Sequence, residues 1–112
     1  MSEQETSYFE WDEGKAELNL RKHGISFDDA AYALLGLALT QESSGYEETR
    51  FTSICIAEGR LIVVVWTPRD GAIRIISARA ARTNERKQYD QAIGRSASAR
   101  HIGLAKGRPT IG

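Results

Sequence analysis

The sequence predicts an α+β domain in which helix-forming segments stand on either side of a run of strand-forming segments. Three β-rich runs follow one another within residues 50–79, and they read RFTSICIAE, RLIVVVWT and AIRIISAR. Branching at Cβ in Val and Ile favours the extended backbone. The breaks at 58–59 and 68–71 are short and contain Gly, which indicates hairpins between antiparallel strands. We therefore expect two N-terminal helices, a twisted antiparallel sheet and a C-terminal helix, with helices packed on one face of the sheet.

The size and composition of the chain fit one globular domain. At 112 residues and 41% hydrophobic content, it is long enough to bury a core and too apolar to be wholly disordered. The first residues, MSEQE, lack the basic and apolar regions of a signal peptide, and no apolar run approaches the ~18 residues of a membrane span. We expect a cytoplasmic protein that does not enter a membrane. Cys55, the single cysteine, is predicted to be a small buried hydrophobic residue.

Two helices are predicted in the first third of the chain. The first covers residues 13–23, with Asp12 as its N-cap and Gly24 at its C-terminal stop. The second begins after Ser26, a good capping residue, and stops near Gly36. One face of the first helix carries residues at helical spacing: Ala16, Asn19, Leu20 and His23.

The strand pattern also predicts positions within the sheet. Residues 61–66 are apolar on both faces, which is typical of a central strand or of one covered on both sides. Short strands are predicted over 8–11, at an edge, and over 37–42. Side chains alternate along a strand, so the last run is predicted to divide between two faces: Ile73, Ile75, Ser77 and Arg79 on one, and Arg74, Ile76 and Ala78 on the other.

The C-terminal part is predicted to contain one helix and a tail. Thr83 is expected to cap a helix over 84–93 that Gly94 ends. Residues 1–94 are therefore predicted to form the single domain. The remaining residues, 95–112, contain four Lys or Arg, no acidic residue and little periodicity, so we expect a flexible basic tail.

The zero net charge of the chain conceals two oppositely charged halves. Residues 1–58 contain four Lys or Arg against twelve Asp or Glu, a formal charge of −8. Residues 59–112 contain eleven against three, a formal charge of +8. Such asymmetry suggests a basic surface for a polyanion. Pairing of the two halves with each other is the alternative.

Arginine is the most promising chemical group in this sequence. Two histidines and one cysteine, without a CxxC or HExxH motif, make a metal site poorly supported, and no Gly-rich loop follows a strand. Permanently charged, planar guanidinium groups suit phosphate oxygens. Lys22 and His23 add an ammonium and a titratable group at a helix end, and the alternative for His23 is a hydrogen-bonded residue at the C-terminus of the helix. Four arginines run from the last strand into the last helix, where a solvated basic face is the alternative: Arg74, Arg79, Arg82 and Arg86.

Two long stretches carry a family resemblance, FEWDEGKAELNLRKHGISFDDAA and GRLIVVVWTPRDGAIRIISARAARTNERKQY. In order and spacing they resemble the BrnT family of type II toxins, which are similar in fold to the RelE-like ribonucleases. The resemblance covers roughly residues 8–90, and the tail lies outside it. Glu13-Gly14 departs from the family pattern, where a Pro-x or Pro-Asn turn is commoner. The matching features are the FEWD strand end, Lys15, segment 19–24, Ser26-Phe27, segment 73–79 and the Glu85-Arg86-x-x-Tyr89 element.

The resemblance implies a RelE-like ribonuclease that inhibits translation, uses the RNA 2′-hydroxyl as nucleophile and needs no metal or other cofactor. It also implies a BrnA-like ribbon-helix-helix antitoxin, held in a two-plus-two complex that represses its operon through operator DNA. We expect the catalytic groups to be Arg79, Arg74, His23 and Lys22, and the RNA-binding groups to be Arg50, Arg82, Arg86, Tyr89 and Lys15. Two other functions stay open: a non-catalytic module that pairs with an antitoxin, and a stand-alone basic RNA-binding domain.

Overall fold

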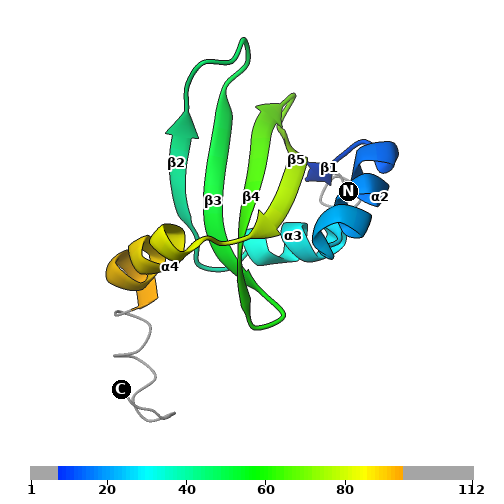
Figure 1. Cartoon of the computed structure of the whole chain (residues 1–112). Coiled ribbons are helices and arrows are strands. Elements are labelled where there is room, and N and C mark those ends of the chain that lie inside the picture. The colour runs from blue at the N-terminus through cyan, green and yellow to red at the C-terminus, as the bar shows by residue number, and fades with distance from the viewer. Residues whose placement is uncertain (1–7, 95–112) are drawn as a thin grey trace. The chain divides into compact units, whose positions relative to one another are not determined.

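The computed structural model describes residues 8–94, which divide between Ala81 and Arg82 into two compact units. The first unit contains a five-stranded sheet in the order β1-β5-β4-β3-β2 (Figure 1). Its strands are β1 (Phe9–Glu10), β2 (Leu39–Ser43), β3 (Arg50–Ala57), β4 (Arg60–Arg69) and β5 (Ala72–Ala80), and its helices are α2 (Glu13–His23) and α3 (Phe27–Leu34). β4 is the central strand of this sheet, which confirms the prediction for the strand over 61–66.

The α+β class fits the structure, but the predicted RelE-like arrangement around an antiparallel sheet is wrong. Strands β2 to β5 are antiparallel neighbours, whereas β1 pairs in parallel with β5, so the sheet is mixed. Only hairpin-connected strands are forced to be antiparallel, and β1 is separated from β5 by most of the first unit. The described residues contain three α-helices, and the last continues as a π-helix instead of forming the simple C-terminal helix of the predicted pattern.

Local hydrogen bonds set the helix ends in the first unit as predicted. The Asp12 carboxylate accepts from the Lys15 backbone N–H at 2.9 Å and starts α2. Gly24 ends this helix with a φ of 72°, a left-handed conformation that favours glycine. The Ser26 hydroxyl accepts from the Asp29 N–H at 3.0 Å and starts α3.

Two-residue turns connect β3 to β4 and β4 to β5. Glu58 and Gly59 have φ values of 54° and 76°, and Asp70 and Gly71 have values of 51° and 82°. Positive φ at both central residues is the requirement of the type I′ turn, whose twist matches the twist of the flanking strands. These turns explain why the sheet is built from tight hairpins at both breaks in the sequence.

The second hairpin is tighter than predicted, because Pro68 and Arg69 belong to β4 and not to the turn. Proline lacks a backbone N–H and normally interrupts a strand ladder. Pro68 pairs with Ile73, whose own N–H points outward and donates to the Tyr8 carbonyl at 2.8 Å. The missing N–H of Pro68 therefore breaks no ladder bond to β5.

One face of the sheet packs against the helices. In Figure 1, α3 crosses this face behind the strands and α2 runs beside β5. Phe27 is 2% exposed, and burial of such a side chain contributes about 1.5–3 kcal/mol. Leu20, which was predicted to share a face of this helix with Asn19, is 49% exposed, whereas Asn19 is 7% exposed. The buried core lies between the helical segment and strands β3, β4 and β5. It consists of Ile25, Phe27, Ala30, Ala31, Ala33, Cys55, Ala57, Ile62, Val64, Ile75 and Ala78.

The described part of the second unit is helical: α4 (Thr83–Tyr89) is followed by the π-helix η1 (Asp90–Gly94). The prediction of Thr83 as cap is wrong, since Arg82 occupies the N-cap position. Its N–H donates to the Glu85 carboxylate at 2.7 Å, which anchors the first turn. The predicted tail over 95–112 lies outside the described residues, and the domain boundary at 94 stays a prediction. Within residues 8–94, no helix is long and apolar enough to cross a membrane.

Candidate functional site

The sheet face opposite the helix-covered one carries Arg50, Arg74 and Arg79, and it is termed the arginine face below. Directly paired residues of neighbouring strands point to the same side of a sheet. Arg74 pairs with Thr67 and Arg79 pairs with Val63, two β4 residues that point away from the face on which Ile62 and Val64 lie. Thr67 and Val63 are themselves buried, at 4% and 0% exposure. The same alternation along β3 places Arg50 on this face.

A β-bulge brings Arg74 and Arg79 to the same face. Strict alternation along β5 predicted opposite faces for these two residues, and that prediction is wrong. The pairing register shifts by one residue at Val65/Trp66 of β4, which leaves Ile76 of β5 as the extra residue. The extra residue reverses the alternation after it. The corrected arrangement puts Arg74, Ser77 and Arg79 on the arginine face, and Ile75 and Ala78 in the core.

The three arginines are spread over the arginine face, and no two of them occupy adjacent positions in the sheet. Arg50 and Arg74 lie two strands apart, so their backbones are separated by roughly 10 Å. The β4 partners of Arg74 and Arg79 are four residues apart, a separation of roughly 13 Å along the sheet. The hydroxyl-bearing residues Thr52 and Ser77 both pair with Val65 of β4, midway between the β4 partners of Arg74 and Arg79. Guanidinium and hydroxyl groups arranged in this way suit an extended polyanion such as a nucleic-acid strand.

Carboxylates lie within ion-pair distance of Arg74 and Arg50. Arg74 Nη1 lies 3.1 Å from a Glu10 oxygen, an ion pair between the acidic and the basic half of the chain. Arg50 Nε lies 3.0 Å from a Glu48 oxygen. Half-exposed pairs of this kind contribute only about 0–1 kcal/mol, so a phosphate group can replace the carboxylate at little cost. Arg79 Nη1 donates to the Ala80 carbonyl at 3.2 Å.

Asn19 fastens α2 to the outer edge of β5. The two-residue strand β1 pairs with Ile73 and Arg74 only. Further along β5, the Asn19 amide takes both backbone groups of Ala78: Nδ2 donates to its carbonyl at 2.8 Å, and Oδ1 accepts from its N–H at 3.1 Å. Nδ2 also donates to the Ile25 carbonyl at 3.1 Å. At 7% exposure, this side chain satisfies buried polar groups and protects a strand edge.

The Asn19 contact also determines where Lys22 and His23 lie. α2 runs in the same general direction as β5 (Figure 1), with Asn19 beside Ala78. Lys22 and His23 occupy the last turn of α2, about one turn beyond Asn19, and both are exposed. They therefore lie toward the same end of the sheet as Arg79, while Lys15 lies in the first turn of α2.

The model of the family described as "Ribonuclease toxin, BrnT, of type II toxin-antitoxin system" matches residues 11–85 of the chain. The chain belongs to the BrnT family. The predicted family membership is thus confirmed, and the match includes Asn19 and all three arginines of the arginine face. It leaves out Glu10 of β1. A comparison with curated proteins found no match.

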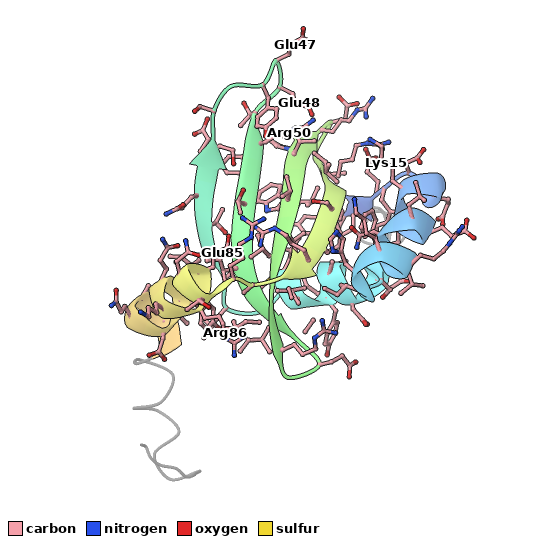
Figure 2. All side chains as sticks on the ribbon, in the orientation of Figure 1. Lys15, Glu47, Glu48, Arg50, Glu85 and Arg86 are labelled. Carbon is pink, nitrogen blue, oxygen red and sulfur yellow. The ribbon has the colours of Figure 1, made fainter. Side chains whose placement is uncertain are left out.

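BrnT proteins are ribonuclease toxins of type II toxin–antitoxin systems, so an antitoxin partner is implied for this chain. The remaining predicted site residues of this BrnT chain lie in the second unit, and Figure 2 labels Arg86 there. Arg82 and Arg86 are exposed, whereas Tyr89 is 5% exposed. Their RNA-binding roles stay predictions, as do those of the residues in the first unit.

Several residues that bear on the BrnT site were not identified as site residues from the sequence. Asn19 gave a signal, because it is a polar residue with modest helix propensity in the middle of a predicted helix. Glu10 and Glu48 gave none, since the partner of a surface carboxylate depends on the tertiary fold. Cys55 is fully buried on the helix-covered face, as predicted, and burial raises the pKa of its thiol to about 11. Among residues 8–94, no group of three or more His, Cys, Asp or Glu is placed to hold a metal ion.

Proposed function

We propose that this BrnT-family protein is an endoribonuclease that cuts RNA by attack of a 2′-hydroxyl on the adjacent phosphorus, without a metal ion, and that it thereby inhibits translation. The observation that carries this proposal is the bulge at Ile76, which sets Arg74 and Arg79 on the same face as Arg50. A strand bulge that aims two guanidinium groups at one surface supports binding of RNA phosphates there.

In the proposed reaction, the 2′-oxygen forms a bond to phosphorus and the bond from phosphorus to the 5′-oxygen breaks. One protein group takes the proton of the 2′-hydroxyl, and another proton is delivered to the departing 5′-oxygen. Arg79 is proposed to stabilise the additional negative charge on the reacting phosphorus oxygens. Arg74, roughly 13 Å away along the sheet, is proposed to clamp a neighbouring phosphate of the same strand. Lys22 and His23 are proposed as the proton-transferring or charge-stabilising groups, since they lie toward the Arg79 end of the sheet.

The antitoxin is proposed to be a BrnA-like ribbon-helix-helix protein that forms a two-plus-two complex and brings the pair to operator DNA. An inhibitor of a phosphate-binding surface has to cover its arginines or match their charge. We propose that an acidic or amphipathic segment of the antitoxin packs on the arginine face. Glu10 and Glu48, which already pair with Arg74 and Arg50, show the kind of contact that such a segment would reproduce.

A second candidate is a non-catalytic module that binds an antitoxin and cleaves nothing. The two carboxylate–arginine pairs favour it, because a surface with internally neutralised arginines is also suited to protein binding. The two functions differ in one observable property, the cleavage of RNA by the purified chain.

The test is incubation of the purified full chain with RNA in excess chelator, followed by analysis of the product ends. Attack by the 2′-hydroxyl leaves a 2′,3′-cyclic or 3′-phosphate and a 5′-hydroxyl. Cleavage that needs added Mg²⁺ or Mn²⁺ and leaves 5′-phosphates would refute the mechanism. Intact RNA under all conditions, together with tight antitoxin binding, would support the non-catalytic module.

A further inference from the structure

The loop between β2 and β3, residues 44–49, carries an exposed aromatic ring beside the arginine face. Tyr46 is 53% exposed, and the guanidinium carbon of Arg50 lies 4.2 Å from the centre of its ring. The Glu48 carboxylate holds Arg50 from another side at 3.0 Å. Figure 2 shows Glu47, Glu48 and Arg50 together at this end of the sheet. Tyr46, Glu47, Glu48 and Arg50 line a hollow here.

We propose that this hollow binds one unpaired RNA base, stacked on Tyr46 and contacted at its edge by Glu48. The proposal rests on the proposed ribonuclease function and adds a determinant of base preference to it. The stacked Arg50 supports the ring, and the exposed part of the ring is available to a base. Aromatic rings of this kind bind bases of single strands because every base has a flat π-face.

The charge of Glu48 selects among bases. A carboxylate only accepts hydrogen bonds, and it pairs with the N4 amino group of cytosine. Uracil carries a carbonyl oxygen at the same position, which a carboxylate repels. The hollow therefore favours a base with an exocyclic amino group, and cytosine over uracil among the pyrimidines.

The position of the hollow fits an RNA strand that crosses the arginine face. Arg50 is the first residue of β3 and pairs with Ser43, the last residue of β2. It lies roughly 10 Å from Arg74 across the sheet. A base held on Tyr46 thus directs the neighbouring phosphates of its strand toward the arginines of the sheet. Arg50 either leaves Glu48 to bind a phosphate or stays stacked on the Tyr46 ring. The exposed part of the Tyr46 ring is available to a base in both cases.

The test uses 2′-O-methyl oligonucleotides of cytidine and of uridine, which bind but lack the attacking hydroxyl. Their affinity for the full chain is measured by fluorescence anisotropy at constant salt. Tyr46→Leu is expected to weaken binding by about 5- to 150-fold, the usual range for one stacked base, whereas Tyr46→Phe keeps the ring and the affinity. Glu48→Gln is expected to reduce the preference for cytidine over uridine. Glu42→Gln is the matched control, since it removes the same charge from an exposed position of β2 outside the lining of the hollow.

Each outcome decides the proposal separately from the ribonuclease function. Equal binding by the parent chain and a folded Tyr46→Leu variant would overturn it, and the loop would then be a structural contact for Arg50 only. If Glu48→Gln leaves the preference for cytidine unchanged, Glu48 does not contact the edge of the base. If the Tyr46 and Glu48 effects appear but the parent chain never cleaves unmodified RNA, the base site stands and the proposed ribonuclease function fails.

Discussion

Replacement of Asn19 by alanine should markedly lower the stability of the fold. The change removes three hydrogen bonds, two to Ala78 and one to Ile25. Each such bond contributes about 0.5–1.5 kcal/mol, so the free energy of unfolding should fall by roughly 1.5–4.5 kcal/mol. A loss near 3 kcal/mol lowers the melting temperature of a domain of this size by roughly 12–24 °C.

Thermal and urea unfolding of the parent chain and the Asn19→Ala variant measure this loss. Asn84→Ala is the matched control, because it makes the same chemical change at an exposed position of α4 and should stay within about 0.5 kcal/mol of the parent. Asn19→Asp keeps the volume but sets a carboxylate against two carbonyl oxygens, so it should also destabilise at neutral pH. A loss below about 0.5 kcal/mol in Asn19→Ala would refute the reasoning, since the β5 edge would then not depend on this amide.

Three further predictions concern other positions. The Cys55 thiol should resist labelling at neutral pH in the native state, and rapid native labelling would contradict its burial. Burial raises the pKa of this thiol from 9.0 to about 11, so between pH 9 and pH 11 the thiol ionises in the unfolded chain but not in the folded one. The free energy of unfolding should therefore fall over this pH range. Gly71→Ala should lower the free energy of unfolding by about 1–2 kcal/mol, because its φ of 82° strains any Cβ-bearing residue; an unchanged urea midpoint would argue against the type I′ turn. Glu10→Gln should raise RNA affinity by up to about fivefold at low salt, because it frees Arg74 from an ion pair that contributes at most about 1 kcal/mol. Weaker RNA binding by this variant would indicate that Glu10 orients Arg74 for RNA.

Local signals in the sequence were sufficient for most elements of the first unit. Asp12 and Gly24 define the ends of α2 through short-range contacts, and such contacts depend on few other residues. The hairpin breaks were predictable because each contains a glycine, the residue that most readily adopts the positive φ found at Gly59 and Gly71. The parallel pairing of β1 was not visible, since it joins segments far apart in the chain and no turn records it.

The candidate site was predictable in composition but not in arrangement. Arginines were expected in β5, yet the alternation rule separated Arg74 from Arg79, because a bulge at Ile76 leaves no clear mark in a run of Ile residues. The positions of Glu10 and Glu48 beside arginines depend on strand pairing and on a loop conformation. Sequence patterns identify which residues carry charge, whereas tertiary structure decides which charges meet.

The central claim is that the arginine face performs RNA cleavage, and the rate of cleavage by Arg79→Ala tests it most directly. The matched control is Arg60→Ala, which removes an exposed arginine from β4 at a position paired with Ala57 of the helix-covered side. Loss of a donor to the transition state costs about 100- to 1,000-fold in rate. Single-turnover cleavage in chelator should therefore fall by that factor in Arg79→Ala and remain unchanged in Arg60→Ala. Equal rates for the parent chain and a folded Arg79→Ala variant would contradict the account.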